Sequence, residues 1–351
     1  MRLSIRLLII VAFSLLLSSP RIISKGSADG GANHRGRNTH FGVSGGNVND
    51  ITKRFCCSGT LGALVTDGTT SYILSNNHVL GLSGKANVGD DISQPGRIDN
   101  GCQLPPIVAD FTAAPPLGSS NVDAAVAQLR PGLMDATGFI EDIGVPSSVV
   151  RAPSVTLGVA KSGRTTGFTT GTIGSINTSV SVQYQAGCGQ GKKFVVSYTN
   201  QVVINSSTFS AGGDSGSLIV TNDSNHQPVA LLFAGSSTTT IGNPIGQVLT
   251  QVSNALGRTV SFVGTTQAAS MDTLANNMLS QELERVHEVK KRHEQSLMSL
   301  PGVIGVGLGD ISGNGELVVY FDRTTGRAHN LPDHVDNVRV RVVDTDTFVA
   351  R

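Results

Sequence analysis

Three short motifs in this chain carry residues that can together perform nucleophilic chemistry. They centre on His78, Asp123 and Ser215, in that order along the sequence. A serine hydroxyl becomes an effective nucleophile at neutral pH when an imidazole takes its proton and a buried carboxylate fixes the tautomer of that imidazole. We therefore predict a hydrolase in which Ser215 is the nucleophile, His78 the general base and acid, and Asp123 the residue that orients His78.

Ser215 has the strongest local pattern of the three. It lies in the stretch Gly-Gly-Asp-Ser-Gly-Ser, residues 212–217, directly before the apolar run 218–220. Glycine lets the backbone approach a substrate closely and lets nearby N–H groups point into one small hollow. The backbone N–H groups of Gly213 and Ser215 are thus predicted to form an oxyanion hole. An ordinary glycine and serine turn is the alternative interpretation.

His78 and Asp123 each border an apolar run that is typical of a strand. His78 follows residues 72–75, whereas the other seven histidines lie in polar turns, in an N-terminal stretch or on a charged helix. Asp123 opens the run 123–127, where an unpaired carboxylate would be costly to bury. A histidine ring N–H is a suitable partner for it. Asp110 competes with Asp123 for this role, because it also follows apolar residues.

The elements that must position these residues are predicted to be strands. Residues 51–264 form a series of short apolar runs separated by turns, with Asp67-Gly68 as a hairpin signal. Such spacing predicts an all-β barrel or sandwich. The runs 193–198 and 201–204 are interpreted as two successive strands.

The N-terminal residues have a different composition. Residues 1–25 are predicted to be a secretory signal peptide or N-terminal anchor, because arginines precede an apolar run at residues 7–17. That run is short for a membrane span, which needs ~20 residues. Residues 26–50 are rich in Gly, Asn, Ser and Arg and are predicted to be a flexible linker. The expected location is secreted or periplasmic, with membrane attachment through an uncleaved segment as the alternative.

Residues 265–351 are predicted to form a helix and a small α/β module. Apolar residues recur at helical spacing within residues 270–300, and charged residues occupy the other faces. Asn314-Gly315 indicates a hairpin. Three strands are predicted to follow the helix, at residues 303–308, 316–321 and 338–343.

Composition and cysteine content limit the classes of function. A formal net charge of +1, with charged residues at 15%, gives no electrostatic footprint for a nucleic-acid partner. No spacing of histidine and cysteine suggests a metal site, and no organic cofactor is implied. Export would permit disulfides. The adjacent Cys56 and Cys57 are expected to bond to Cys102 and Cys188 rather than to each other, with the pairing left open.

Several stretches together match a known pattern. They are Cys-Ser-Gly-Thr-Leu-Gly at 57–62, Asn-Asn-His-Val at 76–79, Val-Asp-Ala-Ala at 122–125, Ser-Gly-Arg-Thr-Thr-Gly at 162–167 and Gly-Asp-Ser-Gly at 213–216. With the order His, Asp, Ser, residues 51–264 resemble the trypsin-like serine proteases of the chymotrypsin clan, most of all secreted bacterial members of the streptogrisin and α-lytic type. The resemblance implies a mainly β fold of two antiparallel six-stranded β-barrels, with the C-terminal module added. The cleft would lie between the barrels, with His78 and Asp123 from the first and Ser215 from the second.

The resemblance also implies roles for residues around the serine. Asp214 would need a buried cation, for which Lys161 and Arg164 are the candidates. Phe209 would form the floor of the substrate pocket. Because neither floor nor wall is acidic, a preference for Lys or Arg is not expected, and Phe209 would favour small or apolar side chains. The wall of the pocket would be Phe233, Ala234 and Gly235.

The sequence thus predicts a secreted serine endopeptidase with protein or peptide substrates. One alternative is a non-catalytic binding or assembly protein on a protease scaffold, against which the intact trio argues. Another is an acyl hydrolase that acts on esters by the same chemistry. The C-terminal module is expected to assist folding, occlude the cleft or bind a partner, within the chain or in another protein. Neither nucleic acid nor a metal ion is expected as a partner.

Overall fold

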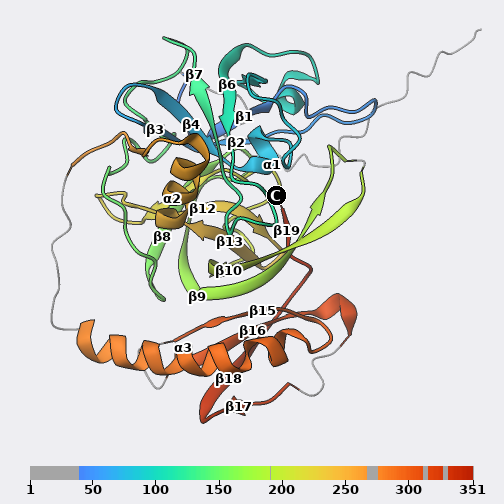
Figure 1. Ribbon diagram of the computed structural model, residues 1–351, viewed down its shortest axis with the longest axis vertical. Coiled ribbons are helices and arrows are strands. Elements are labelled where there is room, and N and C mark those ends of the chain that lie inside the picture. Colours follow the sequence, from blue (N-terminus) through green and yellow to red (C-terminus); the bar gives the residue numbers. More distant parts are fainter. Residues whose placement is uncertain (1–38, 190, 267–275, 311–314, 327–330, 351) are drawn as a thin grey trace, which may run out of the picture.

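The computed structural model of the protein describes residues 39–350 apart from 190, 267–275, 311–314 and 327–330, and only the backbone of 276–281. Two β-sheets lie one above the other, and a smaller module with one long helix lies at the far end of the second sheet (Figure 1). The predicted mainly β fold with a C-terminal helix-containing module is confirmed. Within the described ranges, no helix is long and apolar enough to cross a membrane. The predicted signal or anchor, residues 1–25, lies outside those ranges.

The first sheet brings His78 and Asp123 to one end. Its eight strands have the spatial order β14-β3-β4-β7-β6-β5-β1-β2. β4 and β7 are antiparallel neighbours with Ser75 opposite Ala125, so the residues just after β4 and just before β7 lie close together. The strands are β1 Val43–Asn47, β2 Gly59–Leu61, β3 Ala63–Thr66, β4 Ser71–Ser75, β5 Asp91–Ser93, β6 Ile107–Ala113, β7 Ala125–Leu129 and β14 Ser261–Phe262.

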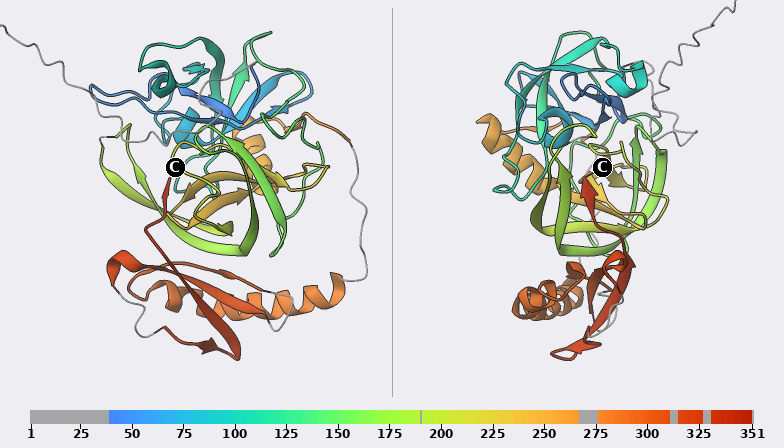
Figure 2. Two further views of the ribbon diagram at one scale, coloured as in Figure 1. Left: turned by 180° about the vertical axis from the view of Figure 1, so that it is seen from behind. Right: turned by 90° about the vertical axis from the view of Figure 1, so that its right-hand side faces the viewer.

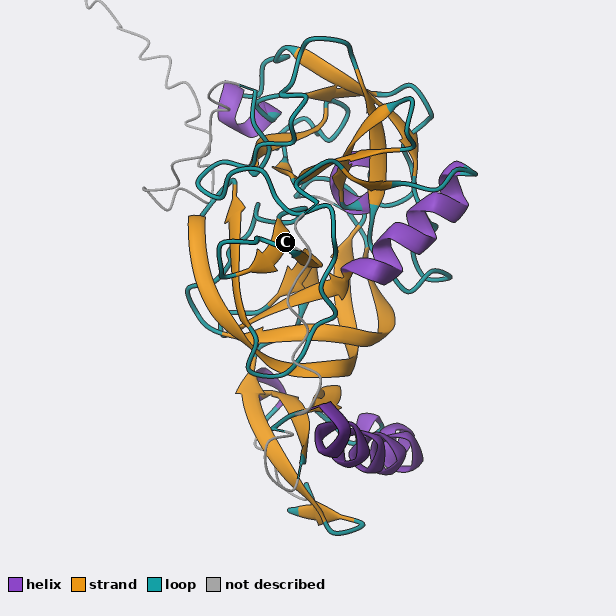
Figure 3. Ribbon diagram, turned by 90° about the vertical axis from the view of Figure 1, so that its left-hand side faces the viewer, coloured by secondary structure: helices purple, strands orange, loops and turns teal. Residues whose placement is uncertain are grey.

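The second sheet contains a long curved hairpin, β9 and β10, which wraps around its other strands (Figure 3). The runs 193–198 and 201–204 are one strand here, which corrects the expectation of two. Asn200 takes a positive φ of 58° and the pairing register shifts beside it, so the chain bulges without leaving the sheet. The strands are β8 Gly158–Gly163, β9 Gly167–Gln185, β10 Lys193–Asn205, β11 Leu218–Thr221, β12 Pro228–Gly235 and β13 Thr239–Pro244.

The C-terminal module extends the second sheet. β15 pairs antiparallel with β9, and β16 and β18 continue outward into the module (Figure 2). This sheet therefore has eleven strands where six were expected. The helix expected over residues 270–300 is α3, Asn276–Met298, which packs on these strands through Val286, Val289 and Leu297. The strands are β15 Val303–Leu308, β16 Glu316–Asp322, β17 His334–Val335, β18 Val338–Thr345 and β19 Val349–Ala350.

Short helices complete the described chain. α2, Ile245–Leu256, is followed by Gly257, which has a positive φ of 73° and caps the helix, and α2 packs on the core of the first sheet through Val248 and Val252. The other helices are α1 Asn77–Leu80, η1 Arg97–Asn100 and η2 Arg323–Thr325.

Part of the predicted linker is a buried strand. β1 lies within residues 26–50, and all five of its residues are buried between β2 and β5. Its small residues, which suggested a linker, permit close packing instead: a Cβ atom at Gly45 would lie 2.4 Å from the Leu61 side chain. The division of the chain into domains otherwise stays a prediction.

Candidate active site

His78 and Asp123 contact each other where α1 follows β4. His78 Nδ1 lies 2.5 Å from Asp123 Oδ2, and the His78 backbone N–H donates to Asp123 Oδ1 at 3.1 Å. The Asp123 side chain is fully buried and the His78 side chain is 14% exposed. This contact fixes the ring with Nδ1 toward the carboxylate, so Nε2 is the nitrogen that can exchange a proton with a substrate. Asp110, the competing acid, pairs with Arg130 at 2.6 Å instead.

Buried amides explain why polar residues precede His78. Asn76 Nδ2 donates to the Asp123 backbone carbonyl at 2.6 Å, and Asn77 Nδ2 donates to another loop carbonyl at 2.9 Å. From the second sheet, Asn243 Oδ1 accepts the Asp123 backbone N–H at 2.9 Å. The histidine and the aspartate are therefore held by side chains from both sheets.

A tyrosine that the sequence did not indicate also holds Asp123. Tyr184, near the end of β9, donates its hydroxyl to Asp123 Oδ2 at 2.8 Å. The hydroxyl of Tyr198 on β10 lies 2.7 Å from that of Tyr184. Burial, together with the Asp123 charge, raises the pKa of Tyr184 well above its ordinary value. Tyr184 therefore stays protonated and is a hydrogen-bond donor to the carboxylate.

Ser215 lies in a turn that only glycine permits on either side. Gly213 and Gly216 have φ angles of 101° and 95°, and a Cβ atom at Gly216 would lie 2.3 Å from the Thr60 carbonyl oxygen. The Thr60 N–H donates to the Ser215 carbonyl at 2.8 Å, and Thr60 Oγ1 donates to the Gly213 carbonyl at 2.9 Å. These bonds attach the turn to β2 of the first sheet. Ser215 Oγ itself donates to the Phe233 carbonyl at 3.2 Å.

Of the backbone N–H groups between Gly213 and Ser217, two have no acceptor in the part of the chain that the structure describes. They belong to Gly213 and Ser215, whereas the N–H groups of Asp214, Gly216 and Ser217 donate to backbone carbonyls. Ser215 is buried and Gly213 is half-buried, and a buried N–H without an acceptor is rare in proteins. The two groups are those predicted to form the oxyanion hole, and they are available to a developing negative charge.

Asp214 is held by a buried cation, as the resemblance implied. Lys161 Nζ lies 3.6 Å from Asp214 Oδ2, and both side chains are fully buried. Burial lowers the pKa of Lys161 to about 8, although the Asp214 charge opposes the effect. Arg164, the other candidate, pairs with Asp99 at 2.6 Å. Asp214 also accepts hydrogen bonds from the backbone N–H groups of Thr165, Thr166 and Ala211.

Two cavities adjoin the turn of Ser215. One has a volume of about 390 Å³ and is lined by His78, Tyr184 and Gly213 among others. The other has a volume of about 580 Å³. From the second sheet and the serine turn, its lining comprises Ser207, Ser210, Ala211, Gly212, Ser236 and Ser237.

Asp50 lines the first cavity together with His78. Burial raises its pKa to about 6, and the nearby His78 opposes part of that rise. Among the described residues, no donor reaches its carboxylate. The sequence did not single out Asp50, because it lies in the stretch that was interpreted as a linker.

The residues predicted to bind substrate are all buried. Phe209 packs among apolar residues beneath the turn and lines neither cavity. Phe233 belongs to another apolar cluster, and Ala234 and Gly235 pair with β19. The structure thus brings His78, Asp123 and the Ser215 turn together, while the assignment of the pocket residues stays a prediction.

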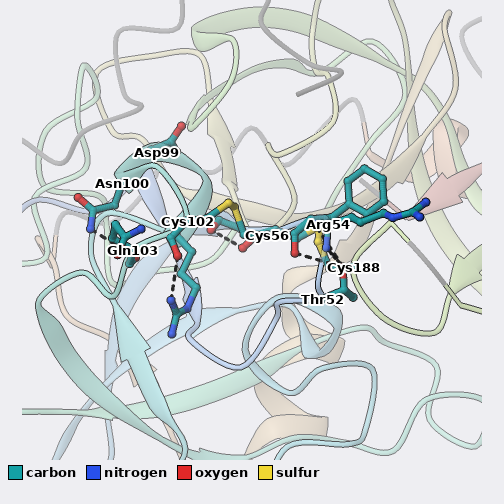
Figure 4. Close-up of a disulfide and its surroundings, with 12 residues drawn as sticks. Thr52, Arg54, Cys56, Asp99, Asn100, Cys102, Gln103 and Cys188 are labelled. Atoms are coloured by element: carbon teal, nitrogen blue, oxygen red, sulfur yellow. Dashed lines mark hydrogen bonds between the residues drawn. A yellow bond between two sulfur atoms is a disulfide. The ribbon is translucent and has the colours of Figure 1, made fainter. Parts of the chain in front are cut away.

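Two disulfides cross this region. Cys56 bonds to Cys102 (Figure 4). Cys57 bonds to Cys188, and the two bonds settle the pairing that the sequence left open. Cys188 lies in the turn between β9 and β10. The second disulfide therefore ties the hairpin that carries Tyr184 to the segment before β2.

Comparison with known proteins gives one family match. Residues 108–237 match the profile of peptidase family S64. The predicted resemblance to trypsin-like serine proteases is confirmed. The matched stretch contains Asp123 and Ser215 and begins after His78, and it supports a serine protease as the class of this chain. No curated protein matches the sequence.

Solved structures with a similar fold are bacterial and other proteases of low identity. A glutamic acid specific serine protease is 19% identical with a TM-score of 0.45, over 63% of this chain and 98% of that chain. Thermobifida fusca protease A is 18% identical with a TM-score of 0.40, over 59% and 91%. Cellulomonas bogoriensis chymotrypsin is 16% identical with a TM-score of 0.42, over 65% and 99%.

Proposed function

We propose that this protein is a secreted serine endopeptidase that hydrolyses peptide bonds through an acyl-enzyme. The observation that carries the proposal is the contact of His78 with the buried Asp123 beside a glycine turn that offers two unsatisfied N–H groups. In the reaction, Ser215 Oγ turns from the Phe233 carbonyl toward His78 Nε2, gives up its proton and attacks the substrate carbonyl. His78 then returns the proton to the leaving amine.

The oxyanion of the tetrahedral intermediate would be bound by the N–H groups of Gly213 and Ser215. Such donors stabilise the charge where it develops, and losing one costs on the order of 10²–10³ in kcat. The buried ion pair of Lys161 and Asp214 holds the backbone of the Ser215 turn in place. The second sheet and the serine turn line the larger cavity with small uncharged residues, and the acidic residue in its lining, Asp346, pairs with Arg323. Small or apolar side chains before the cleaved bond are therefore favoured over Lys or Arg. A peptide-library profile dominated by Lys or Arg would contradict this specificity.

Export is proposed on two grounds. The first is the signal-like pattern of residues 1–25, and the second is the pair of disulfides, which form and persist in oxidising compartments. N-terminal sequencing of the protein from the culture medium would test export, with a new N-terminus after residue 17 expected. Retention of Met1 on cell-bound protein would contradict it.

The catalytic proposal is tested with a fluorophosphonate probe. Folded wild type is expected to be labelled, whereas Ser215→Ala and His78→Ala are expected to remain unlabelled. Comparing rates on a peptide amide and on the matching ester then separates a peptidase from an esterase, because only a peptidase cleaves the amide efficiently. Folded wild type that takes no label and cleaves neither compound would favour the non-catalytic alternative.

A further inference from the structure

The end of β12, which the sequence analysis predicted to form the wall of the substrate pocket, is paired with another strand in this structure. β19 runs antiparallel to β12, with Ala350 opposite Ala234 and Val349 opposite Gly235. It also runs parallel to β9, with Val349 opposite Gln183. β19 therefore lies in a slot between two strands of the second sheet that do not pair with each other in the sheet order.

The slot leads directly to the proposed catalytic residues. Ala350 lines the cavity that contains His78 and Gly213, and it also lines the larger cavity beside Ala211 and Gly212. In Figures 1 and 2 the C-terminal segment of the chain crosses from the module to the space between the two sheets. An extended peptide in this slot would thus pass the Ser215 turn.

We infer that β19 competes with the substrate within the chain: residues 349–350 occupy in cis the slot between β12 and β9 in which an extended peptide would pair. The inference rests on the proposed function. Adding a strand to a sheet edge gains affinity from main-chain hydrogen bonds, which an extended peptide of almost any sequence can form. Val349 is 37% exposed and Ala350 is small, so the resident strand uses little more than its backbone. A substrate can reproduce those contacts and compete for them.

The segment before β19 is fixed much more firmly than β19 itself. Phe348 is fully buried, and its ring packs edge-on against Tyr320 with the ring centroids 5.8 Å apart. The Phe348 backbone carbonyl accepts a hydrogen bond from the Gln183 N–H at 2.8 Å. Thr345 Oγ1 lies 2.5 Å from Ser236 Oγ. This anchor keeps β19 close to the slot even when β19 detaches from it. The local concentration of β19 at the slot is therefore high, as for any tethered ligand.

A second set of bonds strengthens this anchor. Asp346 pairs with Arg323 at 2.7 Å and also bonds to Ser237, which follows β12 by two residues. Thr347 Oγ1 donates to Asp322 at the end of β16. The module therefore places β19, and removing β19 alone leaves this anchor and its contacts intact.

The experiment compares the full chain with a chain lacking residues 349–351. Two substrates are used: a fluorogenic extended peptide and p-nitrophenyl acetate, which is too small to need the groove. Removal of β19 is expected to lower KM for the peptide about 10-fold or more, with kcat and the ester rate nearly unchanged. Val342→Ala serves as the control, since Val342 on β18 is 38% exposed like Val349 but lies away from the slot. Equal peptide KM values in the two chains would overturn the inference.

A binding measurement keeps this result distinct from failure of the proposed function. In a Ser215→Ala background, anisotropy of the same peptide carrying a fluorophore is expected to show tighter binding to the shortened chain by a similar factor. Absence of all hydrolysis in both chains would refute the proposed function, while the binding result would still decide the groove. Equal dissociation constants would refute the groove.

Discussion

At the scale of single residues, the buried environment of Asp123 decides how His78 is held. The carboxylate accepts bonds from the His78 backbone, the His78 ring and Tyr184. A hydrogen bond to a charged group contributes about 1.5–3 kcal/mol. Tyr184 is therefore a positioning residue for the proposed reaction, acting through Asp123.

Tyr184→Phe is expected to lower kcat/KM about 10-fold to 100-fold, because Asp123 loses one donor. The remaining charge on Asp123 then favours a protonated imidazole, so the acid limb of the pH profile of kcat/KM should move to higher pH. Steady-state kinetics across pH 5–9 (about the range in which histidine titrates) measure both effects. Tyr198→Phe, which removes the outer hydroxyl, should have a smaller effect. An unchanged pH profile in Tyr184→Phe would show that the tyrosine has only a packing role.

Asp50→Asn is expected to stabilise the protein above pH 6. The folded-state pKa of Asp50, about 6, exceeds its unfolded value of 3.8, so the native protein holds a proton that the unfolded chain has lost. The free energy of unfolding therefore falls as the pH rises from about 4 to about 6. Removing the charge should regain about 1–3 kcal/mol at pH 7 and nothing at pH 3.5 (about the point below which both states are protonated).

Asp67, whose pKa is lowered and not raised, provides a control for the Asp50→Asn test. The N–H groups of Thr69 and Thr70, with Arg258, hold the pKa of Asp67 well below its usual range. Asp67→Asn should therefore destabilise the protein at pH 7, which is the opposite sign. Denaturant unfolding at both pH values measures the two variants. A loss of stability in Asp50→Asn at pH 7 would contradict the expectation.

At the scale of elements, the β9–β10 hairpin connects the two sheets. It carries Tyr184 and Cys188, and the Cys57–Cys188 disulfide holds it against the segment before β2. The Cys56–Cys102 disulfide instead joins two segments of the first half of the chain. Removing each disulfide in turn therefore compares the effect of releasing the β9–β10 hairpin with the effect of releasing a loop of the first half of the chain.

Replacing Cys57 and Cys188 by serine is expected to cost about 2–5 kcal/mol in the free energy of unfolding. The cost should exceed that of replacing Cys56 and Cys102, because the sequence separations are 131 and 46 residues. The first double variant should also lose peptidase activity under conditions where it is still folded, since the hairpin then holds Tyr184 less firmly. Denaturant unfolding and kinetics measure both quantities. Equal activity losses in the two double variants would argue against a role of the hairpin.

At the scale of the whole molecule, the C-terminal module is part of the second sheet. β15 covers the edge of β9, and Tyr320 and Phe348 belong to the same apolar cluster as Phe233. An exposed strand edge and uncovered aromatic side chains favour association between chains. The module is therefore expected to be needed for a stable monomer.

A chain that ends after residue 264 should aggregate or unfold at lower temperature than the full chain. The chain lacking only residues 349–351 is the control and should stay monodisperse, because Phe348 and β15 remain in place. Size-exclusion chromatography and thermal unfolding measure the difference. Identical melting temperatures and elution volumes for the chain ending after residue 264 and the full chain would mean that the chain up to residue 264, β1 included, folds without the module.

Local sequence patterns were sufficient for several features of the site. Glycines on both sides of Ser215 predicted the turn, because only glycine adopts its positive φ angles at no steric cost. The apolar runs next to His78 and Asp123 predicted the ends of β4 and β7, because alternation and burial of a strand are local properties. The resemblance offered Lys161 and Arg164 as candidate partners for Asp214, and the structure places Lys161 at that contact.

Other features depended on contacts between distant segments. Tyr184 reaches Asp123, and β19 reaches β12, across separations that leave no mark in the local pattern. The small residues of β1 resembled a linker because their close packing against Leu61 is a property of the partner strand. The sequence by itself determined the reactive residue types, the strands that end at them and the glycine turn, since these follow from the chemistry of neighbouring residues. Only the tertiary structure decided which buried hydroxyl supports the carboxylate and which strand fills the groove, since hydrogen bonds and strand pairing join whatever the fold brings together.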